Sequence, residues 1–261
     1  MAKKAQYMIK TVDKDMRAFG GFEWPRKGPV VAPDWDPNQV CGGLHGLLNG
    51  EGDISLLSKS RDAVWLLCRI DGEIVDLDGK IKTNKCTVIA AGDRNKIVNK
   101  LKSLRPDAAV CYCTSVSGDY GTSVSGDYGT SQSGYYGTSV SGDYGMSQSG
   151  YYGTSVSGDY GMSQSGYYGT SQSGEHGTSQ SGVCGKSTSG DYGTSKSCYR
   201  GTSISGVCGT SIVTCPAKAQ TGVGGVIIAY TNHSVVVLRA GNEIEPNIMY
   251  SIDAKGVPTK L

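Results

Sequence analysis

The sequence predicts a mainly β protein: a β-solenoid of 16-residue coils flanked by a small α+β domain and a short β cap. Three observations lead to this fold class. An eight-residue unit recurs from Cys113 to Cys208, which is 96 residues or 12 units. The residues before it have the mixed apolar patterns of a small globular domain, and those after it contain three β-runs. A fixed short period decides the architecture, so we expect domains at 1–111, 112–215 and 216–261.

The repeat unit has the composition of a short strand between turns. Its clearest copy, Gly121 to Tyr128, reads Gly-Thr-Ser-Val-Ser-Gly-Asp-Tyr. Gly supplies the positive φ of tight corners, and two Gly per unit argue against a helix at about 1 kcal/mol each. A flexible Gly/Ser linker is the alternative, but an aromatic recurs in strict register and favours an ordered ladder. That ladder consists of Tyr120, Tyr128, Tyr136, Tyr144, Tyr152, Tyr160 and Tyr168.

Two units make one coil, because the variable positions alternate. Val124, Val140 and Val156 alternate with Gln132, Gln148 and Gln164. The 12 units therefore form six coils, which at about 4.8 Å per coil give a rod of roughly 29 Å. Strand alternation puts Thr and Val on one face and the two Ser on the other. We expect Thr and Val to line the thin interior and the serines to face solvent.

The outward rows are the predicted binding surface. The serine rows comprise Ser123, Ser125, Ser131, Ser133, Ser139, Ser141, Ser147, Ser149, Ser155 and Ser157. An acidic row comprises Asp127, Asp143 and Asp159, continued by Glu175 and Asp191. A solvated edge that prevents aggregation and a row for a basic partner are two interpretations of the acidic row.

The sixteen-residue coil resembles the repeats of bacterial ice-nucleation proteins, which run Gly-Tyr-Gly-Ser-Thr-x-Thr and carry a Tyr ladder. The resemblance implies that Ser123 and Ser125 occupy that family's outward Thr-x-Thr positions and that Tyr128 occupies its ladder. In that family the methyl and hydroxyl groups of threonine together order water. This chain has serine at those positions and far fewer coils, so the resemblance implies the fold more directly than the ice function.

Composition restricts the classes of partner. A net charge of +2 over 261 residues argues against nucleic acid as a partner. We expect no membrane segment and no signal peptide. The nine cysteines are odd in number and lack zinc-finger spacing, so reduced thiols in the cytoplasm are expected, with no metal and no cofactor.

The N-terminal domain is predicted to contain several strands and one helix. A short strand that leads into a turn is expected at 16–25, another at 27–31, and further strands at 63–70, 73–78 and 85–91. Asp93 then caps a helix from Arg94 to Leu104 that ends before Pro106. Its apolar face consists of Ile97, Val98, Leu101 and Leu104.

One segment of this domain suggests chemistry. Cys41 and His45 are four residues apart in a glycine-rich stretch and could be a nucleophile and its base, or two metal ligands. No second ligand pair or orienting acid can be located from the sequence. A glycine-rich turn with a structural histidine is the favoured interpretation, so no catalytic residue is predicted.

A second resemblance, to an uncharacterised family of phages and prophages, extends over the whole chain. That family has a small N-terminal domain with a Gly-Phe/Leu-His turn, Gly-Asp-Tyr-Ser-type repeats and a β cap with a Gly-rich step. The matching segments here are Phe19–Phe22, Gly43–His45, the Gly-Asp-Tyr copies, 221–229 and 244–250. The family has no established activity, and a phage setting implies a host protein as partner and the bacterial cytoplasm as location.

The cap is predicted from three β-runs at 226–230, 234–239 and 247–252, with a hairpin turn at 231–233. A solenoid needs such a cap because its last coil exposes an unpaired edge. The favoured function is a non-enzymatic interaction or scaffold protein with a protein partner, and self-association through the Tyr or Ser rows is compatible with it. The alternatives are ice or ordered-water binding, and an N-terminal enzyme that uses Cys41 and His45.

Overall fold

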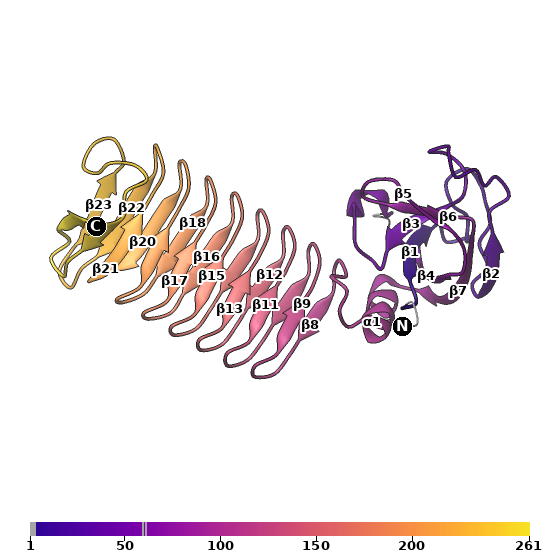
Figure 1. Cartoon of the computed structure of the whole chain (residues 1–261), viewed down its shortest axis with the longest axis horizontal. Helices are drawn as coiled ribbons and strands as arrows, with labels where there is room; N and C mark the ends of the chain where they lie inside the picture. Colours follow the sequence, from indigo (N-terminus) through magenta and orange to yellow (C-terminus); the bar gives the residue numbers. More distant parts are fainter. Residues whose placement is uncertain (1–3, 59, 61) are drawn as a thin grey trace. The chain divides into compact units, whose positions relative to one another are not determined.

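The computed structural model describes residues 4–58, 60 and 62–261. The chain divides into two compact units, Met1–Cys113 and Thr114–Leu261. In Figure 1 the first unit, in indigo and purple, is a sheet with one helix, and the second, from magenta to yellow, is a stack of similar coils. The predicted fold class is confirmed.

The first unit is built on a seven-stranded antiparallel sheet with the strand order β2-β7-β4-β1-β3-β6-β5. The strands are β1 (Tyr7–Val12), β2 (Gly28–Val31), β3 (Leu44–Leu48), β4 (Val64–Ile70), β5 (Ile74–Asp76), β6 (Ile81–Thr83) and β7 (Lys85–Gly92). A 3-10 turn, η1 (Ile54–Leu56), precedes β4. The strands predicted at 27–31, 63–70, 73–78 and 85–91 are therefore confirmed to within a few residues.

Two sequence-based predictions in this unit are wrong. Residues 16–25 form the predicted turn, but the strand expected to lead into it is reduced to a single bridge between Arg17 and Glu23. Residues 44–46, predicted to lie in a glycine-rich turn, instead begin strand β3. The partners of β3, strands β1 and β6, are distant in the sequence, and local composition does not report them.

The sheet buries both of its faces. Along β4, Leu66 and Cys68 join one core with Met8, whereas Trp65 and Leu67 join the other. This alternation is the two-residue period of a strand, and it explains why the run reads as continuously apolar.

The helix α1 (Arg94–Leu104) covers the second core. It begins as predicted, because the Asp93 side chain accepts a hydrogen bond from the Lys96 N–H at 2.9 Å. Ile97, Val98 and Leu101 are buried, whereas Leu104 in the last turn is 37% exposed. The predicted apolar face is thus confirmed except at its last residue.

In the second unit the strands alternate between two parallel sheets. One sheet contains β8 (Thr114–Val116), β10 (Thr130–Gln132), β12 (Met146–Gln148), β14 (Met162–Gln164), β16 (Thr178–Ser181), β18 (Thr194–Ser197), β20 (Thr210–Thr214) and β22 (Val226–Tyr230). The other contains β9 (Thr122–Val124), β11 (Thr138–Val140), β13 (Thr154–Val156), β15 (Thr170–Gln172), β17 (Lys186–Thr188), β19 (Thr202–Ile204) and β21 (Ala217–Gln220).

The solenoid has about seven coils, one more than predicted. Neighbouring strands of one sheet pair in register at a sixteen-residue offset, for example Ser131 with Ser147. This parallel pairing continues through β22 and β21, beyond the last recognisable octapeptide. Backbone pairing depends on strand geometry and not on the repeat sequence, so the coils extend beyond the last octapeptide.

The serine side chains point inward, which reverses the predicted faces. Of the ten serines expected to face solvent, Ser133 is half-buried and the others are at most 5% exposed. Ser131 Oγ donates to the Val140 carbonyl oxygen of the opposite sheet at 2.6 Å. The two sheets are therefore close enough for one serine side chain to bridge them, and Val or Thr would not fit between them. The hydrogen bond offsets the cost of burying the hydroxyl.

The corners also differ from the prediction. Positive φ falls on the Tyr position of each unit, at 56° for Tyr128 and 54° for Tyr144, and not on the repeat glycines. The glycines are required by close contact. A Cβ on Gly142 would lie 2.1 Å from Asp127 Oδ1.

The last coils are closed by antiparallel strands. β22 pairs with β23 (Val235–Arg239), which confirms the predicted hairpin. β21 pairs with β24 (Tyr250–Ile252), which lies within the β-run predicted at 247–252. β24 also pairs with β25 (Pro258–Lys260), a strand that the sequence did not predict. A separate apolar core lies here, with Val213, Ile227 and Ile252.

Candidate functional site

The solenoid presents two different flat faces. On β9, β11, β13 and β15 the outward side chains are Thr122, Val124, Thr138, Val140, Thr154, Val156, Thr170 and Gln172, and we term this the Thr–Val face. On β10, β12, β14 and β16 they are Thr130, Gln132, Met146, Gln148, Met162, Gln164, Thr178 and Gln180, which we term the Gln–Met face. The threonines and valines of the first face were predicted to line the interior, and that prediction is wrong.

The predicted serine rows cannot contact a partner in the folded chain. Their side chains point into the rod, where some hydroxyls are hydrogen-bonded, as when Ser147 Oγ donates to the Ser139 carbonyl oxygen at 2.7 Å, whereas those of Ser141 and Ser157 are buried without a partner in the described part of the chain. The outward positions lie one residue earlier, at Thr122 and Val124. A shift of one residue along a strand exchanges its faces.

The acidic row is part of the coil-to-coil hydrogen bonding. Asp143 N–H donates to Asp127 Oδ1 at 2.9 Å, and Asp159 N–H donates to Asp143 Oδ1 at 2.8 Å. The pattern continues at Glu175, whose N–H donates to Asp159 at 2.7 Å. Burial raises the pKa of Asp127, the hydrogen bond from Asp143 lowers it, and the neighbouring Asp143 charge raises it further. These carboxylates therefore join successive coils by hydrogen bonds, independently of any external partner.

Tyrosines stack along both edges of the rod. Tyr128 and Tyr144 stack with ring centroids 4.9 Å apart, and Tyr144 and Tyr160 follow at 5.0 Å. On the other edge a second row, Tyr135, Tyr151 and Tyr167, stands beside the predicted one, with Tyr135 and Tyr136 edge to face at 4.6 Å. The second row was missed as a surface feature, although its sixteen-residue spacing is visible in the sequence.

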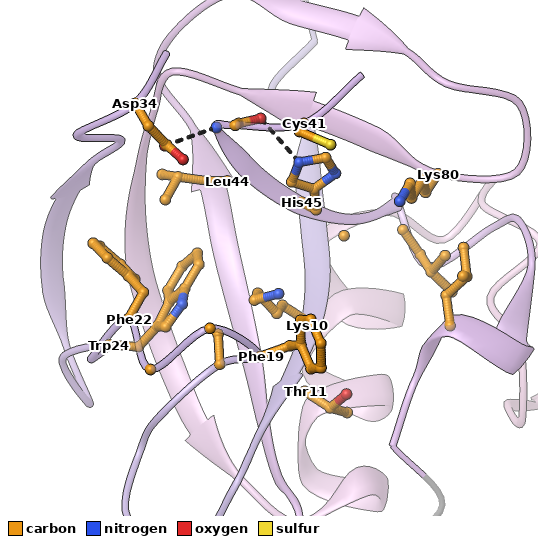
Figure 2. A pocket seen from close by; sticks show the side chains of 18 of the residues that line it. Lys10, Thr11, Phe19, Phe22, Trp24, Asp34, Cys41, Leu44, His45 and Lys80 are labelled. Atoms are coloured by element: carbon orange, nitrogen blue, oxygen red, sulfur yellow. Dashed lines mark hydrogen bonds between the residues drawn. The ribbon is translucent and has the colours of Figure 1, made fainter. Parts of the chain in front are cut away.

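The first unit contains a cavity of about 870 Å³ that Cys41 and His45 both line (Figure 2). His45 Nε2 lies 2.9 Å from the Gly42 carbonyl oxygen. A carbonyl can only accept, so Nε2 carries the proton. Burial lowers the pKa of His45, and Lys80, Lys10 and Lys82 act in the same direction against the Gly42 hydrogen bond. The imidazole is therefore neutral at pH 7.

Glycines shape the wall next to His45. Gly42 and Gly43 have φ of 84° and 87°, and a Cβ on Gly42 would lie 2.3 Å from the Asp34 carbonyl oxygen. Gly43 N–H donates to Asp34 Oδ1 at 3.0 Å (Figure 2). The glycine-rich turn was recognised in the sequence, and its contact with Asp34 was not.

Lys82, which the sequence did not single out, supports the same loop from within. It is fully buried, and its Nζ donates to the carbonyl oxygens of Asp36, at 2.5 Å, and Gln39. The ammonium also lies 5.2 Å from the centroid of the Trp35 ring. A buried lysine of this kind fixes the loop that precedes Cys41.

Within the described residues, no three or more His, Cys, Asp or Glu side chains gather as metal ligands. Among the same residues no helix is long and apolar enough to cross a membrane.

Comparison with known proteins gives one family model, in the first unit, and two similar proteins. Residues 6–100 match the model of a domain of unknown function, DUF7666. Over 108 residues the chain is 29% identical to the ice nucleation protein InaU of Pantoea ananas, and equally to an ice nucleation protein of Enterobacter agglomerans. The match covers 40% of this chain but only 10% and 9% of those proteins. No solved structure matches the chain.

Proposed function

We propose that the solenoid is a non-enzymatic binding module whose Thr–Val face binds ice or ordered water. The observation that carries the proposal is the in-register stacking of Thr122, Thr138 and Thr154, with the valines two residues further on stacked beside them. The match to ice nucleation proteins supports it.

The geometry of this face suits a lattice of water. Thr and Val two residues apart are separated by about 6.6 Å along a strand, and the coils repeat at about 4.8 Å. Hydroxyl and methyl groups thus alternate at fixed spacings on a flat surface. Inward serines help to hold that surface rigid, since several of them donate to backbone across or along the rod, as Ser139 does to the Gln148 carbonyl oxygen at 2.6 Å.

The face is small. Complete Thr–Val pairs occur on β9, β11 and β13, and Gln172 replaces Val on β15. The chain also spans about a tenth of the length of the curated relatives it matches. We therefore expect adsorption to existing ice crystals, seen as thermal hysteresis, rather than efficient nucleation of freezing.

Thermal hysteresis and ice-affinity capture of the full chain test the proposal. Val140→Lys places a charge at the centre of the Thr–Val face and should abolish both signals. Gln148→Lys places the same charge on the Gln–Met face and should leave them unchanged. Wild-type protein without hysteresis or capture, or equal loss in the two variants, would reject ice binding by this face.

A second candidate, a scaffold for a protein partner, rests on the Tyr edge. Tyr135, Tyr151 and Tyr167 are 40–49% exposed, and tyrosine is enriched in protein interfaces. A host protein would be the expected partner if the chain is phage-derived. Capture of one partner by wild type and its loss on joint replacement of these three tyrosines by serine would support this role. Capture that survives the replacement would contradict it.

A further inference from the structure

The central sheet of the first unit splits between β1 and β3. β1 pairs with β4 along its whole length, from Tyr7 to Val12, but with β3 only at Met8 and Ile9. Beyond Ile9, strand β3 turns to pair with β6 instead. The cavity of about 870 Å³ is lined by Lys10 and Thr11 of β1 and by residues 44–47 of β3, where the β1–β3 ladder has ended. Its volume is typical of a small-molecule site.

The walls of this cavity are largely apolar and aromatic. Phe22 and Trp24 meet edge to face with centroids 5.8 Å apart, and Leu44 and Leu57 also line the space. Figure 2 shows Phe22, Trp24 and Leu44 as neighbours along one side of the view. Such walls favour a ligand with a flat apolar body.

The charges in the lining are mainly positive. Lys10 and Lys80 are half-buried, and no salt bridge involves either of them among the residues that the structure describes. Asp34 is the one acid among the described residues of the lining, and its carboxylate accepts the Gly43 N–H. Lys10 Nζ lies 5.6 Å from the centroid of the Trp24 ring. Burial lowers the pKa of Lys10, as expected for an ammonium without a counter-ion.

Two lining residues also carry buried polar atoms without partners. Trp24 Nε1 and His45 Nδ1 have no hydrogen-bond partner in the described part of the chain. Buried polar atoms are nearly always paired, so the Trp24 N–H is a reason to expect a bound acceptor, whereas His45 Nδ1, unprotonated because Nε2 carries the proton, would accept from a donor. An indole N–H and an ammonium are donors only, and together they select an acceptor.

We propose that this cavity binds a small organic anion of the aromatic carboxylate class, with its carboxylate at Lys10 and its ring against Phe22 and Leu44. The proposal concerns the first unit and is independent of ice binding by the solenoid. A cationic ligand would meet two lysines. A neutral apolar ligand would leave the Lys10 ammonium unpaired, which is costly in a desolvated site.

The test uses the full chain and 2-naphthoate as probe, with 2-naphthalenemethanol as its neutral counterpart, in isothermal titration calorimetry. We expect saturable one-to-one binding of the acid and about tenfold weaker binding of the alcohol, because a charge-assisted hydrogen bond is lost. Lys10→Met should weaken the acid about tenfold, and Lys10→Arg should retain it. Lys27→Met, an exposed lysine outside the cavity, controls for net charge.

A second measurement does not depend on any cavity variant folding. The chain has three tryptophans, so its indole N–H resonances can be assigned by Trp24→Phe. Naphthoate should shift the Trp24 resonance in wild-type protein and leave the other two in place. No saturable binding, equal affinity for acid and alcohol, an unchanged dissociation constant in folded Lys10→Met, or an unmoved Trp24 resonance would overturn the proposal.

Discussion

The carboxylate of Asp127 accepts a hydrogen bond from the backbone N–H of Asp143, sixteen residues later, at 2.9 Å. One coil is thereby tied to the next by a charged side chain whose neighbours along the rod carry the same charge. The hydrogen bond stabilises the ionised carboxylate of Asp127. Burial and repulsion from Asp143 destabilise it and raise its pKa. Stability at this edge should therefore depend on pH.

Asp127→Asn should raise the melting temperature at pH 7, because the amide keeps an acceptor oxygen and removes the charge. The pKa of Asp127 is higher in the folded than in the unfolded chain. Ionisation of Asp127 therefore lowers the free energy of unfolding at pH values above the folded pKa. This loss of stability disappears as the pH falls through the folded pKa. The difference between variant and wild type should shrink accordingly, in thermal melts from pH 7 to pH 3. Asp253→Asn is the control of opposite sign, since backbone hydrogen bonds from Val257, Lys255 and Gly256 lower the pKa of Asp253.

Ser147→Val should lower the free energy of unfolding by about 1–3 kcal/mol, because the interior has no room for the added methyls. The serine is fully buried, and its hydroxyl bond to Ser139 would also be lost. Gln148→Val, at the next and outward-facing position, should change stability by no more than about 0.5 kcal/mol. Denaturant unfolding followed by circular dichroism measures the stability of both variants. Equal effects of the two substitutions would mean that the interior is not tightly packed.

Tyr144→Gly should be more stable than Tyr144→Ala by about 0.5–1 kcal/mol, which inverts the usual order. Both variants lose stacking on Tyr128 and Tyr160. Alanine keeps the strain of φ 54°, about 1–2 kcal/mol, and glycine relieves it at a smaller entropic cost. Chemical denaturation of the two variants measures the gap. An alanine variant at least as stable as the glycine variant would contradict the left-handed corner.

Lys82→Met should lower the free energy of unfolding by about 2–3 kcal/mol, because it removes charge-assisted hydrogen bonds from a buried ammonium to the carbonyl oxygens of Asp36 and Gln39 in the loop. The same variant should weaken naphthoate binding, since Asp34 and Val40 in this loop line the cavity. Lys85→Met, at an exposed position, should change neither quantity. Unaltered stability in Lys82→Met would show that the loop does not depend on the buried ammonium.

The features that depend on local residue patterns could be predicted from the sequence. The sixteen-residue coil follows from the alternation of Val124 with Gln132, and the helix follows from Asp93 and the spacing of its buried residues. Strand alternation also showed that Thr122 and Val124 share a face opposite the serines. The period of a pattern shows which side chains lie on the same face, and this is sufficient to predict the coil and the helix.

Which face of each repeat strand points into the solenoid could not be predicted from the sequence and follows from the packing of the two sheets. Both assignments satisfy the same alternation, and general hydrophobicity favours Val124 over Ser123 for the interior. The outcome depends on the separation of the two sheets, which is short enough for Ser131 to hydrogen-bond the opposite backbone. The cavity likewise joins Lys10, Trp24 and His45, which are distant in sequence. Distances between separate strands set both results, and no short stretch of residues encodes them.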